Sequence, residues 1–137
     1  MPKAIGIDYG SKRIGIAISD SSSVIASPLC TVSNQEIFKF LRDLFKNEDV
    51  NCIVVGEAKN LDGSETDSSI PIERFIKKLI SKYPKLKIET IDERFTSKIA
   101  EKSIIDAGIK LKKRRNKELI NEVSATIILQ DYLSYRI

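Results

Sequence analysis

The sequence predicts an α/β domain in which a mixed β-sheet carries helices on both faces. Two alternating strands joined by a tight turn open the chain, and helix-like and strand-like segments then alternate along it. The chain has 137 residues, 42% of them hydrophobic, which is enough for one globular unit with a single core. We therefore expect residues 1–137 to form one domain.

Strands over residues 3–8 and 13–19 form the predicted hairpin, and its two faces differ in bulk. One face carries only isoleucines, namely Ile5, Ile7, Ile14, Ile16 and Ile18. The other face carries small residues, with Gly6 on the first strand and Gly15 on the second. A helix can approach such a bare face closely. Asp8 lies at the rim of this face, where acids from later segments can join it.

The next segments predict a strand, a helix and a buried strand. Residues 26–32 form an extended piece. Residues 35–46 form a helix because their apolar residues recur at the spacing of one buried stripe, and Asn34 suits the N-cap position. Residues 52–56 are a continuous apolar run too short for a helix, which is typical of a central strand buried on both faces.

The second half of the chain continues the alternation. Residues 69–82 predict a helix whose inward face is formed by Ile72, Phe75, Ile76, Leu79 and Ile80. Residues 85–92 predict a strand. A helix over 96–107 begins at a threonine cap and ends before Gly108, a residue suited to a left-handed stop. The final helix, over 117–135, has apolar residues around much of its circumference, so we expect it to be largely buried.

The composition excludes several kinds of chemistry. A chain without histidine has no Ser-His-Asp triad, no Cys-His pair and no imidazole-bound zinc, which leaves carboxylates, lysines and metal-bound water. Cys30 and Cys52 fall in predicted strands without metal-ligand spacing, so we expect buried free thiols. The longest apolar runs are only strand-length and the first strand begins almost at once, so we expect a cytoplasmic protein without membrane contact.

Basic residues are concentrated between the last two predicted helices. Five cations fall within six residues there: Lys110, Lys112, Lys113, Arg114 and Arg115. Such density is unfavourable unless an anion comes near, so we expect contact with nucleic-acid phosphates; the alternative is a solvated loop that keeps the protein soluble. Lys12 and Arg13 flank the Asp8 turn and would meet the same backbone. No aromatic ladder accompanies these charges, which favours backbone recognition over base stacking.

Four stretches of the chain together resemble the YqgF family, also called RuvX. They are residues 5–20, residues 53–56 with Asp62-Gly63-Ser64, Asp92-Glu93-Arg94 with Thr96-Ser97, and residues 124–133. The resemblance runs from residue 3 to 133, with the motifs in the family's order. It implies a ribonuclease H-like fold with a five-stranded mixed sheet whose first three strands are antiparallel. It also implies a divalent-metal-dependent nuclease of structured RNA or DNA, in ribosomal RNA maturation or at branched DNA.

The resemblance and the chemistry of phosphodiester hydrolysis point to the same acids. Two carboxylates that hold Mg²⁺ or Mn²⁺ can activate a water and neutralise the scissile phosphate. We expect Asp8 to be one ligand, the alternative being a residue that caps the hairpin turn. We expect Glu93, or else Asp92, to be the second, the alternative being a solvated acidic pair that bonds Arg94. Arg94 itself could hold a ligand in place or touch a phosphate.

The third acid is where this chain departs from the family's pattern. The family's final helix usually carries an aspartate four residues before the alanine of a Ser-Ala pair, and this chain has Asn121 there. An amide oxygen can coordinate a hard cation but brings no charge. Glu118 shares a helical face with Asn121 and could substitute, whereas Glu122 points about 100° away. Glu57, at the end of the central strand, is a further candidate, the alternative being a solvated loop glutamate.

Three other functions compete with ribosomal RNA processing. A Holliday junction resolvase would act on branched DNA and would ordinarily be a two-fold dimer; the sequence leaves monomer and homodimer open. A non-catalytic RNA-binding protein of ribosome assembly would keep the fold without the third acid, and Asn121 is the feature that favours it. The Asp8 hairpin also resembles the phosphate loop of actin-like and sugar-kinase ATPases, but those enzymes need a second domain, for which 137 residues leave no room.

Overall fold

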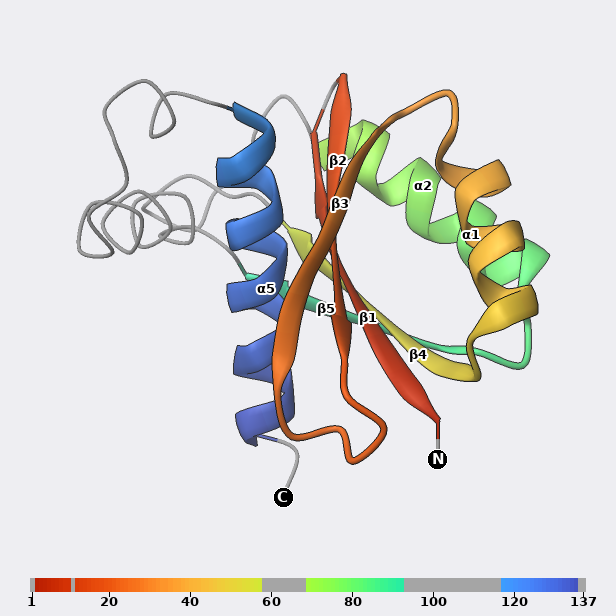
Figure 1. The fold of residues 1–137 in the computed structure, drawn as a ribbon. Helices are drawn as coiled ribbons and strands as arrows, with labels where there is room; N and C mark the ends of the chain where they lie inside the picture. The colour runs from red at the N-terminus through yellow and green to blue at the C-terminus, as the bar shows by residue number, and fades with distance from the viewer. Residues whose placement is uncertain (1, 11, 58–68, 93–116, 136–137) are drawn as a thin grey trace.

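The fold is a five-stranded mixed sheet with helices on both faces (Figure 1). The computed structural model describes residues 2–10, 12–57, 69–92 and 117–135. The strands stand in the order β3-β2-β1-β4-β5, with bounds β1 Lys3–Tyr9, β2 Arg13–Ser19, β3 Ala26–Ser33, β4 Val50–Glu57 and β5 Lys87–Asp92. The first three strands pair antiparallel, and β4 lies parallel to both β1 and β5. The expected mixed sheet is therefore confirmed.

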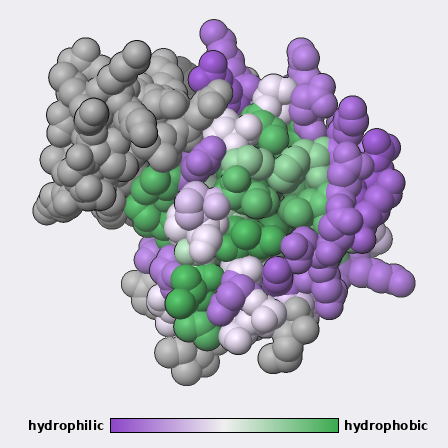
Figure 2. Space-filling model, viewed as in Figure 1, coloured by the Kyte–Doolittle hydropathy of each residue, from purple (hydrophilic) through white to green (hydrophobic). Residues whose placement is uncertain are grey.

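Among the described residues, two helices cover one face of the sheet and one covers the other (Figure 1). α1 (Ile37–Asn47) and α2 (Ser69–Lys82) lie together on the bulky face, and α5 (Lys117–Tyr135) lies on the bare face. Figure 2 shows apolar side chains between the strands and α1, with hydrophilic side chains over the outer flank of the molecule. No helix in the described part of the chain is long and apolar enough to cross a membrane.

Each face of the sheet supports its own core. The core under α1 and α2 contains the hairpin isoleucines, joined by Ile37, Leu41, Ile53, Val55, Ile72, Phe75 and Leu79. The core under α5 uses smaller strand residues: Ala4, Ala17, Cys52 and Val54 pack against Ala125, Ile128, Leu129 and Leu133. Burial of each large aliphatic side chain contributes about 1.5–3 kcal/mol. The unequal faces of the hairpin thus decide which helices pack where.

Close approach of α5 depends on two glycines of the hairpin. A Cβ atom added to Gly6 would lie 2.7 Å from the carbonyl oxygen of Ala125 and 2.7 Å from the Cβ atom of Leu129. A Cβ atom added to Gly15 would overlap the backbone of Asn121. Neither position has room for a side chain, so the predicted approach of a helix over the glycine face is confirmed.

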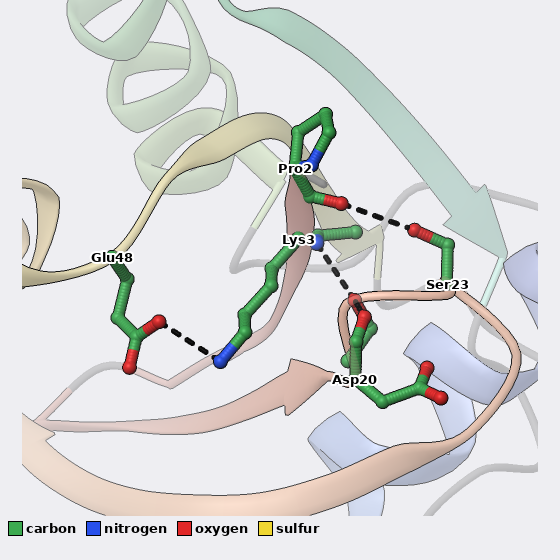
Figure 3. A network of polar contacts seen from close by, with 7 residues as sticks. Pro2, Lys3, Asp20, Ser23 and Glu48 are labelled. Carbon is green, nitrogen blue, oxygen red and sulfur yellow. Dashed lines mark hydrogen bonds and ion pairs between the residues drawn. The ribbon is translucent and has the colours of Figure 1, made fainter.

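The sheet end where β1 begins is closed by a polar network (Figure 3). The Lys3 ammonium lies 2.9 Å from the Glu48 carboxylate. The buried Ser19 hydroxyl accepts a hydrogen bond from the Ala4 amide at 2.8 Å and donates one to the Asp20 carbonyl at 3.1 Å. The Asp20 carboxylate accepts hydrogen bonds from the amides of Val24 and Ile25 and so closes the turn between β2 and β3. These contacts hold the turn after β2 and the residue after α1 to the start of β1.

Some local predictions differ from the structure. α1 begins at Ile37, its N-cap is Glu36 without a side-chain bond, and Asn34 instead donates to the Gly10 carbonyl at 2.8 Å. Ile80 is 51% exposed, so its predicted inward position is wrong; the buried stripe of α2 is narrower than expected. Cys52 is buried, whereas Cys30 is only half-buried because β3 is the sheet edge; both are free thiols. The predicted helix over 96–107 lies outside the described residues.

Candidate functional site

Asp8 occupies a row across the sheet in which its neighbours on both sides are glycines. Its Cα partner on β2 is Gly15, and its partner on β4 is Gly56. Thr31 and Ile91 continue the row on the outer strands β3 and β5. Because glycine has no side chain, the space beside the half-buried Asp8 carboxylate stays free of strand side chains at this level.

Asn121 of α5 lies directly over this row. A Cβ atom added to Gly15 would come within 2.9 Å of the Asn121 Cβ atom. Gly15 and Asp8 are a directly opposed pair on neighbouring antiparallel strands, whose Cα atoms stand about 4.5–5.5 Å apart. The half-buried Asn121 side chain therefore starts one strand away from Asp8. The fold brings together two of the predicted site residues that are separated by most of the chain.

The contacts of α5 fix which side of the helix faces which strand. On one side, Glu122 accepts a hydrogen bond from the Thr31 hydroxyl, and Gln130 accepts one from the Ala26 amide, so this side faces β3. On the other side, Tyr132 contacts Cys52 of β4 at 3.8 Å and lies under the Lys87 ammonium. Glu122 thus points away from Asn121 toward the sheet edge, as the helical spacing predicts.

Ser124 is a feature of this helix that the sequence analysis did not single out. One helical turn after Asn121, it lies on the side of α5 away from Glu122, toward β4. It is fully buried, and among the described residues its hydroxyl has no hydrogen-bond partner. Buried hydroxyls are normally paired, and an orphan of this kind marks a place for a water molecule or an ion. No sequence pattern reveals such an orphan, because it depends on how the helix packs.

The remaining predicted acids are placed only in part. Glu57 and Asp92 are Cα partners at the ends of β4 and β5, one register position beyond the Asp8 row. Glu118 lies in the first turn of α5. The structure gives the backbone of these three residues. Glu93 lies outside the described residues, so its approach to Asp8 stays a prediction.

The predicted nucleic-acid contacts are also placed in part. Lys12 and Arg13 are exposed at the hairpin turn, beside the strand end that carries Asp8. Asn34, the residue after β3, holds this turn. Its backbone amide donates to the Lys12 carbonyl, and its side-chain amide donates to the Gly10 carbonyl. Arg94 and the basic segment over 110–115 lie outside the described residues.

The donor atoms of this region suit a hard cation. In the part of the chain that the structure describes, no three Asp, Glu, His or Cys side chains gather to hold a metal. Asp8 offers a carboxylate, and Asn121, whose Cβ atom lies over Gly15, offers an amide oxygen. Mg²⁺ and Mn²⁺ prefer such ligands. These two donors therefore suit a hard divalent cation, whereas Glu93, the predicted second carboxylate, lies outside the described residues.

Thiol chemistry has no support in this structure. Burial, and then the negative charge of Glu122, raise the pKa of the Cys30 thiol above its ordinary value. A thiol with a raised pKa is protonated at neutral pH and is a poor nucleophile. Cys52 is buried under α5. Carboxylate-bound metal remains the chemistry that the site residues favour.

Comparisons with known proteins find matches over nearly the whole length of this chain. A family model described as RuvX, Holliday junction resolvase, matches residues 2–135. A protein of Christiangramia forsetii is 49% identical over 97% of this chain and 98% of its own length, and one of Flavobacterium psychrophilum is 47% identical over the whole of both chains. Both carry the name "Putative pre-16S rRNA nuclease".

Solved structures with the same fold include two resolvases bound to Holliday junctions. The fowlpox virus resolvase complex has a TM-score of 0.59 at 13% identity and covers 98% of this chain and 99% of its own. The Thermus thermophilus RuvC complex has a TM-score of 0.59 at 13% identity, with 99% and 96% covered. Those likenesses establish the fold. The family model and the relatives of more than 40% identity show in addition that this chain belongs to the RuvX family, which is described as Holliday junction resolvase.

Proposed function

We propose that this protein is a divalent-metal-dependent endonuclease that cleaves structured nucleic acid, most specifically at the 5′ end of the 16S ribosomal RNA precursor. The observation that carries the proposal is the placement of Asp8 between Gly15 and Gly56 near the end of the central strand β1, with Asn121 of α5 over Gly15. The choice of RNA is supported by the names of relatives that match this chain over its full length.

Asp8 and Glu93 are the residues that would hold Mg²⁺ or Mn²⁺ in this proposal, with Asn121 as a weaker third donor. The cation would supply an activated water and neutralise charge on the scissile phosphate. Asp8 brings its carboxylate from a rigid strand end, which fixes its direction. Asn121 contributes an uncharged oxygen from α5. Asp92, Glu57 and Glu118 are the reserve acids at the same edge of the molecule.

The proposed substrate contacts include two described residues, and a residue and a segment that lie outside the described part of the chain. Lys12 and Arg13 stand at the exposed hairpin turn, and we assign Arg94 and the segment 110–115 to the same phosphate-binding role. We take residues 1–137 as one domain that works in the cytoplasm as a monomer or a homodimer. Cleavage of a symmetric DNA junction would call for the homodimer, whereas cleavage of a single RNA end would not.

Two alternatives have specific support. The family description and the junction-bound structural neighbours favour branched DNA as substrate. Asn121, an amide where the family usually has an acid, favours a ribosome-assembly protein that binds RNA without cutting it. All three candidate functions include binding of a nucleic acid. They differ in which nucleic acid is cleaved, or in whether any is, so activity assays distinguish them.

The test offers purified protein a 5′-extended 16S precursor fragment and a four-way DNA junction, each with Mg²⁺ or Mn²⁺. We expect cleavage of the RNA by the wild type, no cleavage by Asp8→Asn and faster cleavage by Asn121→Asp. Preferential cleavage of the junction would move the substrate to DNA. Tight RNA binding by all three forms, with no cleavage by any of them, would establish the assembly protein and overturn the nuclease.

A further inference from the structure

A second basic surface lies on α2, on the face of the sheet opposite α5 (Figure 1). Arg74, Lys78 and Lys82 follow one another at intervals of four residues, so they form one row along the helix, and all three are exposed. Residues 69–86 hold five cations and one acid, a net charge of +4 that equals the net charge of the whole chain. The charge excess of the chain is therefore concentrated here as well as in the segment 110–115.

The row continues onto α1 through an aromatic ring. The Lys78 and Lys82 ammonium groups each lie 4.9 Å from the centre of the half-buried Phe38 ring. Arg42 stands one helical turn after Phe38, and its charge acts on the Tyr83 hydroxyl at the end of α2. Cations of two helices thus converge over the line where α1 and α2 meet. We call Arg74, Lys78 and Lys82 of α2, together with Arg42 of α1, the α2 cation row.

These cations have no acid to neutralise them in the described part of the chain. The ion pairs among the described residues join Lys3 to Glu48 and Lys87 to Glu89, and neither pair includes a member of the α2 cation row. Like charges one helical turn apart repel one another. The arrangement costs free energy in the isolated protein, and that cost is recovered when an anion binds across several of the cations.

A membrane surface is a poorer match for this row than a nucleic acid. A helix that lies on a membrane inserts an apolar face between the lipids. The apolar face of α2 is already used, because Ile72, Phe75 and Leu79 are buried against the sheet. Ile80 is the one exposed large hydrophobic residue of this helix in the described structure. A phosphodiester backbone needs only spaced cations, and it offers spaced charges in return.

We propose that the α2 cation row binds the phosphodiester backbone of RNA at a second contact, separate from the Asp8 edge. This inference takes its ligand from the proposed function. The row lies on the α1 and α2 side of the sheet, while α5 covers the other side, so a bound RNA would have to extend past the edge of the sheet to reach both (Figure 1). The contact would add affinity without sequence preference and would leave the cleavage step itself unchanged.

The test measures binding of the 5′-extended 16S precursor fragment in EDTA, so that no cleavage occurs, over a range of salt concentrations. The variant Lys78→Gln/Lys82→Gln removes two charges of the row. The matched control Lys39→Gln/Lys46→Gln removes two charges from exposed lysines that lie outside residues 69–86 and for which the described structure shows no ring contact. We expect the first variant to bind about tenfold more weakly, with a salt slope smaller by about 1.4–1.8, and the control to change affinity less than twofold.

The outcomes distinguish this inference from the proposed nuclease activity. Equal weakening by both double variants, or by neither, would overturn the α2 contact, whatever the wild type cleaves. A wild type that binds but does not cleave, with the loss confined to Lys78→Gln/Lys82→Gln, would support the contact and overturn the nuclease. Anionic phospholipid vesicles are the second arm: binding to vesicles that depends on these lysines, with RNA affinity unchanged, would also contradict the inference.

Discussion

Gly15 of β2 and Asn121 of α5 are in direct contact, and no side chain separates them. A Cβ atom added to Gly15 would lie 2.9 Å from the Asn121 Cβ atom and closer still to the Asn121 carbonyl oxygen. Gly15 is also the cross-strand partner of Asp8. The absence of a side chain at one position therefore sets how closely the helix that carries Asn121 approaches the strand that carries Asp8.

Substitution Gly15→Ala should destabilise the protein. The added methyl group meets backbone atoms of α5 that cannot rotate away, so the helix must shift from the sheet. We expect the free energy of unfolding to fall by about 1–3 kcal/mol, measured by urea denaturation. Thr90→Ala, at an exposed position of β5, is the control and should change it by less than about 0.5 kcal/mol. Equal stability of Gly15→Ala and the wild type would contradict the close contact.

Substitution Asn121→Asp should strengthen metal binding. It places a carboxylate over Gly15, beside Asp8, where the chain now has an amide. We expect Mn²⁺ to bind about tenfold more tightly, a gain of about 1.4 kcal/mol, measured by calorimetric titration. Ser134→Asp adds the same charge at the far, exposed end of α5 and should leave the affinity unchanged. If both variants behave alike, Asn121 is not near the metal.

Two buried serines should respond to alanine substitution with opposite signs. The Ser124 hydroxyl has no hydrogen-bond partner in the described part of the chain, so Ser124→Ala removes an unsatisfied group and should raise the free energy of unfolding by about 1 kcal/mol in metal-free buffer. The Ser19 hydroxyl accepts from the Ala4 amide, so Ser19→Ala leaves that amide unpaired and should cost about 1–3 kcal/mol. Urea denaturation of both variants checks this; a loss of stability in Ser124→Ala would show that its hydroxyl is bonded.

The turn that follows β2 should give the protein an acid-sensitive contact. Hydrogen bonds from the Val24 and Ile25 amides lower the pKa of the Asp20 carboxyl from its ordinary value of 3.8. A lowered pKa means that the stabilisation is complete above the unfolded pKa and disappears as the pH falls below about 4. Between pH 5 and pH 2.5, Asp20→Asn should therefore lose less stability than the wild type, as measured by urea midpoints. Asp43→Asn, on the surface of α1, is the control and should follow the wild type.

Periodicity predicted the strands and the described helices because each element carries apolar residues at its own spacing. The bare face of the hairpin predicted the close approach of a helix, but only the structure shows that this helix is α5 and that α1 and α2 pack on the isoleucine face. Asn34 shows the limit of this reasoning. The sequence predicts it as a helix N-cap, but its side chain donates to the Gly10 carbonyl because β3 brings it beside the hairpin turn. Ile80 shows the same limit, since its exposure depends on the width of the buried stripe.

The candidate site could be anticipated one residue at a time, but not as an arrangement. Asp8 was found from its place at a strand end, and Asn121 from its place in the family's pattern. Their proximity depends on which turn of α5 lies over Gly15, and that is a packing property. The α2 cation row was missed because its members are ordinary surface residues in sequence, and the ring of Phe38 under Lys78 and Lys82 depends on how α1 packs beside α2.

We propose that Asp8 holds a catalytic cation near the end of the central strand β1. The most direct test is the rate at which Asp8→Asn cleaves the 5′-extended 16S precursor in the presence of Mg²⁺. If the lost metal ligand stabilises the transition state by about 4 kcal/mol, the cleavage rate falls about a thousandfold. We predict such a loss, with urea midpoint and RNA affinity in EDTA retained. Cleavage by Asp8→Asn at the rate of an active wild type would contradict the claim.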